Sequence, residues 1–379
     1  MKDGTMTEKY PYTPSRLKLA RKRRGMTLVR LEQVTGITTR TLSDYENGRV
    51  KELRVTAAAL KTLAGALEVP VAFLTAEEIE EVPAEAVSFR APSKLTAGQR
   101  DAALAAARIA IMINEWIEDR FRLPLADLPS LPGRDPEWAA QHVRDQWGLG
   151  VAPISNMVHL LEARGIRVFS LAEECLEVDA FSFYWKSTPY VILNTRKSGE
   201  RGRFDAAHEL GHLVLHAQHE IPHGKDAEQQ AQRFASAFLM PEPAVIARRL
   251  HNATVDRVLA ARSVWKVSAM ALTYRLQELN LVTEWGYRTL ATNLSRMGYR
   301  RGEPEGIARE SSQLLSKVFA ALRTEGVTPV QIADALHIRL NELSDEVFGL
   351  TPAIPVKALP GETVFQTTSP AHPPLQLVK

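Results

Sequence analysis

Three residues near the middle of the chain have types and spacing that suit metal chemistry. His208 and His212 are four residues apart, so on an α-helix both imidazoles project from one face and can bind a single zinc ion. Glu209 follows the first histidine, where a carboxylate can take a proton from an activated water and later deliver it to a leaving amine. A surface helix with two hydrogen-bonded histidines is the alternative interpretation of so short a pattern.

The third metal ligand must come from elsewhere in the sequence. The metzincin pattern is excluded, because Leu215 and Gln218 stand where it has a glycine and a third histidine. A gluzincin takes a glutamate from the next helix, and Glu228 lies at the head of the apolar stripe of the helix predicted over 226–240. A lone carboxylate facing a core is costly unless paired or metal-bound, so Glu228 is preferred to Asp226. The alternative is that Glu228 only begins its helix.

Three more histidines follow the motif. His216 continues the same helical face, where it is expected to contact a metal ligand, to assist at an oxyanion, or to pack in the core. His219 and His223 are expected in an exposed loop.

The elements around the motif indicate a small sheet. The segments "GIRVFSL", "AFSFYWK" and "PYVILNT" are rich in β-branched and aromatic residues and are bounded by Gly, Pro and Ser. We expect the strand "YVILNT" to be a sheet edge along which an extended polypeptide substrate binds through main-chain hydrogen bonds. The alternative is a strand in the core.

These residues resemble a known family. "AFSFYWKSTPYVILNTRKSGERGRFDAAHELGHLVLH" followed by "EQQAQRFASAFLMP" is similar to the ImmA/IrrE family of zinc metallopeptidases. The resemblance implies a zincin-like fold of the gluzincin type, His208, His212 and Glu228 as zinc ligands, and Glu209 as the catalytic acid and base. Gln232 departs from the family, which commonly has an asparagine there.

The amino-terminal part of the chain is strongly basic. Between Pro14 and Arg54 there are eleven basic and four acidic residues, although the net charge of the whole chain is only +3. The acidic run "AEEIEEVPAE" follows at once, so the positive field is confined to one domain. Short helices separated by glycines predict a compact five-helix domain there.

One part of this domain predicts DNA binding. "TLVRLEQVTGITTRTLSDYENGR" has two helices joined by a glycine-containing turn, and it resembles the Xre/Cro-type helix-turn-helix family. Glu32 stands where that family usually packs a small alanine. Bases or phosphates are expected to contact Thr38, Thr39, Arg40 and Ser43, and phosphates to contact Arg21, Arg23, Arg24 and Arg49. The alternative is a solvated basic face on a protein-docking module.

The whole chain is expected to be mainly α with a small β-sheet. The predicted parts are a flexible amino terminus (1–13), the helix-turn-helix domain (14–75), a linker (76–98), the peptidase domain (99–290), a C-terminal helical region (291–348) and a Pro-rich tail (349–379). No internal repeat is evident. The single cysteine, Cys175, excludes an internal disulfide and a cysteine metal cluster. With no apolar run of membrane-spanning or signal-peptide length, we expect a cytoplasmic protein.

Two functions fit these features. The resemblances imply a regulator that binds operator DNA and whose zinc endopeptidase domain cleaves a repressor, itself or a partner, in a stress, phage or toxin–antitoxin response. A toxin partner and a homodimer are further expectations, the latter because one recognition helix covers one half of a symmetric operator. The alternative is a non-catalytic DNA-binding regulator or antitoxin whose peptidase-like domain binds a ligand or a partner.

Overall fold

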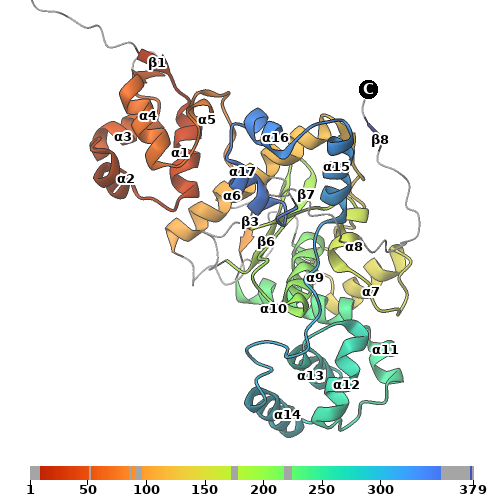
Figure 1. Cartoon of the computed structure of the whole chain (residues 1–379). Helices are drawn as coiled ribbons and strands as arrows, with labels where there is room; N and C mark the ends of the chain where they lie inside the picture. The colour runs from red at the N-terminus through yellow and green to blue at the C-terminus, as the bar shows by residue number, and fades with distance from the viewer. Residues whose placement is uncertain are drawn as a thin grey trace, which may run out of the picture. The chain divides into compact units, whose positions relative to one another are not determined.

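The computed structural model describes residues 9–50, 53–84, 87–89, 96–171, 178–216, 224–350 and 376–377. The chain forms two compact units that interleave along the sequence. Unit 1 comprises Met1–Glu81, Ala105–Leu123 and Leu314–Lys379, and unit 2 comprises Val82–Leu104 and Pro124–Gln313. The elements are mostly helices, with one small sheet as the main β structure (Figure 1). The expected mainly α fold is therefore confirmed.

The amino-terminal part of unit 1 is the expected five-helix domain. It contains α1 (Pro14–Arg23), α2 (Leu28–Thr35), α3 (Thr39–Glu46), α4 (Ala57–Ala66) and α5 (Val71–Thr75). The side chains of Thr27, Thr38 and Thr56 accept hydrogen bonds from the first turns of α2, α3 and α4, which fixes where these helices begin. A short antiparallel pair, β1 (Lys9–Pro11) with β2 (Arg54–Thr56), closes the domain.

The stretch after α5 packs against the start of α1. Thr13 Oγ1 donates a hydrogen bond to the carbonyl oxygen of Ala76 at 2.5 Å, and the Ile79 amide donates to Ser15 Oγ at 3.2 Å. Ile79 is buried. The first residues of the expected linker thus belong to the amino-terminal fold.

The rest of unit 1 comes from later in the chain. The second half of α6 (Ala97–Glu118) belongs to it, as do α15 (Gln313–Thr324), α16 (Pro329–Leu336) and α17 (Leu340–Glu346). β4 (Phe121–Arg122) pairs with β8 (Gln376–Leu377). Most of the expected Pro-rich tail lies outside the described residues.

The helices α16 and α17 repeat the local structure of α2 and α3. Gly25, Gly36 and Gly48 have positive φ and correspond, at the same spacing, to Gly326, His337 and Gly349, which also have positive φ. Both segments start with a threonine N-cap, Thr27 and Thr328. The buried Leu31 and Leu42 correspond to Ile332 and Leu343. Residues 326–349 thus have the local form of a second helix-turn-helix, and the expectation of no repeat was wrong.

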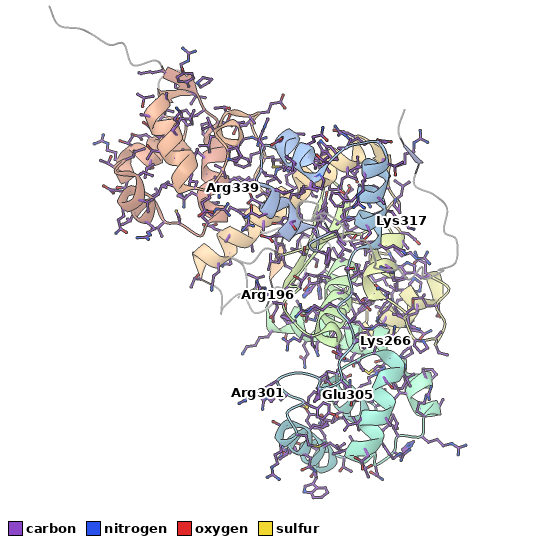
Figure 2. The ribbon with its side chains drawn as sticks, viewed as in Figure 1. Arg196, Lys266, Arg301, Glu305, Lys317 and Arg339 are labelled. Carbon is purple, nitrogen blue, oxygen red and sulfur yellow. The ribbon has the colours of Figure 1, made fainter. Side chains whose placement is uncertain are left out.

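One substitution distinguishes the two segments at the start of the second helix. Arg339 stands where the first segment has the N-cap Thr38, and it makes no side-chain cap. Its guanidinium forms an ion pair with Glu68 at 3.1 Å. Arg339 is labelled in Figure 2.

Unit 2 is built on a four-stranded sheet in the order β3-β6-β7-β5. Its strands are β3 (Val87–Phe89), β5 (Arg167–Ser170), β6 (Ala180–Trp185) and β7 (Thr188–Leu193). β7 pairs antiparallel with β6 and parallel with β5, and β3 pairs antiparallel with β6. Val191, Ile192 and Phe181 are fully buried, so the sheet is part of the core.

Helices cover this sheet and extend beyond it. They are α7 (Pro136–Gln146), α8 (Met157–Ala163), α9 (Gly199–Leu215), α10 (Lys225–Leu239), α11 (Glu242–Ala247), α12 (Val255–Trp265), α13 (Ala269–Glu278) and α14 (Glu284–Arg296). α9 packs on β6 and β7 and lies against α10 (Figure 1). In the part of the chain that the structure describes, no helix is both long and apolar enough to cross a membrane.

Candidate functional site

The helix α9 carries the histidine motif into the core of unit 2. Ser198 caps it by accepting a hydrogen bond from the Arg201 amide. Gly211 allows α10 to approach closely, because a Cβ there would lie 3.2 Å from Ala231 Cα and 3.1 Å from the Phe234 ring. The glycine inside the motif therefore sets the distance between the two helices that carry the candidate ligands.

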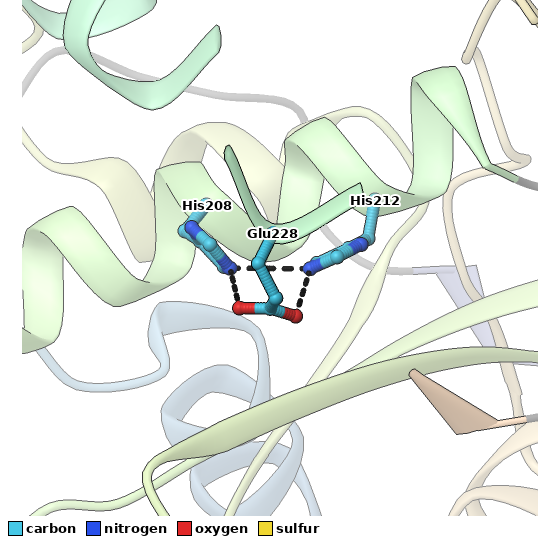
Figure 3. Close-up of side chains that lie close together, drawn as sticks. All are labelled: His208, His212 and Glu228. Atoms are coloured by element: carbon cyan, nitrogen blue, oxygen red, sulfur yellow. Dashed lines mark hydrogen bonds and ion pairs between the residues drawn. The ribbon is translucent and has the colours of Figure 1, made fainter. Parts of the chain in front are cut away.

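His208, His212 and Glu228 converge on one point between α9 and α10 (Figure 3). The Nε2 atoms of the two histidines are 3.1 Å apart. The two carboxylate oxygens of Glu228 lie 3.4 Å from His208 Nε2 and 3.2 Å from His212 Nε2. Both histidines are buried, and the Glu228 side chain is 22% exposed. Asp226, the alternative ligand, is exposed on the same helix.

This donor set fits a zinc ion. Zinc in catalytic sites takes three protein ligands of nitrogen and oxygen type and leaves one position open. Two imidazole nitrogens at the usual zinc distance with a tetrahedral angle would be about 3.3 Å apart. The observed separation of 3.1 Å is close to that value. Two neutral donors and one carboxylate are thus arranged as a zinc ligand set.

The charge of Glu228 suits a ligand. Burial opposes its ionisation, but hydrogen bonds from His208 and His212 outweigh burial and lower its pKa to about 2. The carboxylate is therefore ionised at neutral pH and ready to accept a cation.

Glu209 lies on the side of α9 that faces the sheet. It is 1% exposed, and its Oε2 accepts a hydrogen bond from Ser182 Oγ at 2.7 Å. Burial raises its pKa to about 7, against the opposing effects of His212 and the Ser182 hydroxyl. A carboxyl group with this pKa can take and release a proton near neutral pH. Ser182 was missed from the sequence, because a serine in a strand gives no signal of its partner.

His216 continues the chain of contacts from the candidate ligands. His212 Nδ1 and His216 Nδ1 are 3.0 Å apart, and His216 Nε2 is 2.9 Å from Gln230 Oε1. Because the Gln230 oxygen can only accept, His216 Nε2 carries the proton and His216 Nδ1 accepts one from His212. In this tautomer His212 Nε2 would have a lone pair with which to ligate a cation, in place of its contact with Glu228. His219 and His223 lie outside the described residues.

The expected position of the substrate strand was wrong. β7, which contains "YVIL", is hydrogen-bonded on both sides, to β6 and to β5. A strand in this position has no free main-chain groups for a peptide. The run of buried residues in β7 is typical of a central strand, so the alternative interpretation as core is the correct one.

A cavity of about 560 Å³ adjoins the same faces of α9 and α10. Its lining includes Asp205, one turn before His208, and Gln232, one turn after Glu228. Arg196, before α9, and Arg301, after α14, also line it. Both residues are labelled in Figure 2. Gln232, which stands where the family commonly has an asparagine, therefore lies in the wall of a cavity. It is not one of the three candidate ligands.

In the helix-turn-helix, the start of α3 is open to solvent. Thr38 and Arg40 are exposed, and Thr39 and Ser43 are half-buried. Arg49 is exposed, and within the described residues neither it nor Arg40 makes an ion pair. Glu32 accepts a hydrogen bond from the Thr39 amide at 3.1 Å, so the residue that departs from the family helps to cap α3.

Arg21 and Arg23 of α1 and Arg24 directly after it were predicted to contact phosphate, but each has partners within the fold. Arg23 is 2% exposed and lies 3.3 Å from Glu342 and 3.6 Å from Glu346, both on α17. Arg24 donates to the carbonyl oxygens of Leu67 and Glu68, and its Nη1 atom lies 3.8 Å from the Glu342 carboxylate.

Arg21 makes two hydrogen bonds to Glu46, at 2.6 and 2.8 Å. A guanidinium held by carboxylates of its own chain is not available to a phosphate. The prediction fails for these three arginines, because a count of basic residues does not show which of them have acidic partners in the fold.

Two family models match the chain. Residues 17–74 match the model described as helix-turn-helix, and residues 161–277 match the model described as IrrE N-terminal-like domain. The chain thus carries an Xre-like helix-turn-helix domain fused to an ImmA/IrrE-type peptidase domain, as the sequence resemblance predicts. It is a DNA-binding regulator with a peptidase-like domain. No curated protein matches the chain significantly.

Proposed function

We propose that the peptidase-like domain is a zinc-dependent endopeptidase and that it cleaves a transcriptional repressor, either this chain or a partner. One observation carries the proposal: His208, His212 and Glu228 converge within the core while Ser182 holds the Glu209 carboxylate beside them. Two histidines that only stabilise a helix would not need a third donor from α10 or a second carboxylate held at their side by Ser182.

The side chains have separate tasks in peptide hydrolysis. His208, His212 and Glu228 would hold the zinc ion, which supplies Lewis acidity toward a carbonyl and lowers the pKa of water. Glu209 takes the proton of the attacking water and delivers it to the nitrogen of the leaving amine, so the C–N bond breaks with a C–O bond formed. Ser182 fixes the carboxylate that moves the proton, and His216 fixes the ring of His212.

The helix-turn-helix would place this activity at an operator in double-stranded DNA. α3 would enter the major groove, with Arg40 and Thr38 contacting bases or phosphates. A symmetric operator would require a homodimer, since each α3 covers one half-site. The peptidase would then act on a repressor bound nearby, during stress or phage infection or beside a toxin partner.

Comparison of protein termini in cells tests the proposal. Cells that carry the wild-type chain should contain new termini in this chain or in a neighbouring regulator, and cells that carry Glu209→Gln should lack them. Gel shifts on the DNA upstream of the chain's own coding sequence test the operator. DNA binding without any difference in termini would leave a regulator or antitoxin whose peptidase-like domain binds a ligand or partner without turnover.

A further inference from the structure

The sheet of unit 2 contains one strand from outside the peptidase-type domain. The family match begins at residue 161 and includes β5, β6 and β7, whereas β3 comes from the stretch that follows the helix-turn-helix domain. Without β3, the order would be β6-β7-β5, and β6 would be an edge strand on which α9 packs. β3 therefore covers an edge that belongs to the catalytic domain.

The register brings β3 next to the catalytic carboxylate. Ser88 pairs with Ser182 of β6, between the pairs Val87 with Phe183 and Phe89 with Phe181. Ser182 is the residue that donates to Glu209 at 2.7 Å. Neighbouring strands lie about 4.8 Å apart. The backbone of Ser88 is thus one strand spacing from the side chain that positions Glu209.

Strand addition is a general way to bind peptides. The main-chain hydrogen bonds are independent of sequence, so the edge of β6 accepts any extended segment of suitable shape. From the sequence we expected a substrate to pair with β7, but β7 is a central strand. β6 packs against α9 and would have a free edge without β3. In this structure the chain's own β3 occupies that edge.

We infer that β3 is bound as a peptide substrate, and that the peptidase cuts its own chain at a bond within Val87–Phe89. This inference rests on the proposed function. Water adds its oxygen to the carbonyl carbon, the C–N bond breaks, and the proton that Glu209 takes from water passes to the amine nitrogen. The products are a new carboxylate and a new ammonium group. The cut falls between the two matched domains, residues 17–74 and 161–277, and separates them in the chain.

The direct test is intact-mass and terminal-peptide mass spectrometry of the full-length chain during incubation with zinc. A fragment that begins at Ser88 or Phe89 should accumulate in the wild type and be absent from Glu209→Gln. The variant Ser88→Pro should also stay uncut, because proline removes a main-chain donor and disfavours a strand. The control Glu80→Pro changes exposed irregular backbone and should be cut like the wild type.

A binding measurement gives a readout that is independent of activity. A fluorescent peptide of residues 84–92 should bind zinc-free Ser88→Pro about tenfold more tightly than the zinc-free wild type, if β3 occupies the edge nine-tenths of the time. Equal affinities for the two proteins would overturn the inference.

A second substrate separates failure of this inference from failure of the proposed function. Casein, an unfolded protein, should be cut by the wild type and spared by Glu209→Gln. If casein is cut while this protein stays whole, or is cut only outside Val87–Phe89, the inference of self-cleavage at β3 is overturned. The proposed peptidase activity would still be supported. If the peptide binds as expected but neither casein nor the chain is cut, the proposed function itself fails.

Discussion

The candidate metal site and the amino-terminal helix-turn-helix both gather charged and polar side chains, but they use them differently. Around α9, two imidazoles and a carboxylate point at one another, an arrangement that a cation would complete. In α1, Arg21 and Arg23 point at carboxylates of their own chain. Converging donors mark a ligand site, whereas satisfied charges mark a packed interface, even where both come from conspicuous sequence patterns.

The largest effect is expected at Glu209. Glu209→Gln removes the proton carrier but no metal ligand, so peptide cleavage should fall by about 10²–10⁴-fold. Zinc content and thermal unfolding should match the wild type. Cleavage at the wild-type rate would assign the catalysis to another residue and remove the functional meaning of the metal centre.

The next effect concerns the buried ion pairs that Arg23 of α1 makes. Arg23→Ala removes the guanidinium nearest to the buried carboxylates of Glu342 and Glu346, so the free energy of unfolding of unit 1 should fall by about 3–5 kcal/mol. Urea unfolding measures this. Arg40→Ala, on the exposed start of α3, is the matched control and should change stability by less than about 0.5 kcal/mol. If Arg23→Ala and Arg40→Ala lower the free energy of unfolding by equally small amounts, the Arg23 guanidinium is solvated.

A smaller effect is expected at His216, which contacts the candidate ligand His212. His216→Ala removes the acceptor that orients His212, so zinc affinity should fall by about 10–100-fold. Competition with a zinc chelator measures it, and His142→Ala, at an exposed position on α7, serves as the control. Unchanged affinity in both variants would show that His212 needs no such support.

The effect expected to be the smallest lies in DNA recognition. Arg40→Ala should weaken binding to the specific operator by about 1–3 kcal/mol if Arg40 contacts a base. Arg49→Ala should instead weaken binding to all sequences alike and flatten the salt dependence. Gel shifts at several salt concentrations distinguish the two. A loss at Arg40 that is the same for all sequences would make it a phosphate contact.

The sequence predicts that His208, His212 and Glu228 lie together, because all three are on helices of known period. His208 and His212 share a face by spacing alone, and the apolar stripe of α10 orients Glu228 toward the same core. The sheet order is not encoded locally, so β7 was mistaken for an edge and β3 was missed. Ser182 and Gln230 depend on tertiary packing, and neither residue type suggests a partner.

The helix-turn-helix shows a related limit. α2 and α3 follow from their threonine caps and glycines, but the matching local structure at 326–349 was missed, because His337 takes the place of Gly36 and α17 carries acidic residues. Local backbone form is shared between the two segments, whereas surface charge is not. The roles of the three arginines at the end of α1 could not be assigned without knowledge of Glu46, Glu342 and Glu346.

Metal content is the measurement that tests the central claim most directly. Protein purified without added metal or chelator and then titrated with zinc should hold one zinc ion per chain in the wild type and in Asp226→Ala. His212→Ala and Glu228→Ala should hold none under the same conditions, because each loses one of three ligands. A wild-type chain without a stoichiometric zinc site, or a Glu228→Ala variant that binds zinc as tightly as Asp226→Ala, would contradict the account.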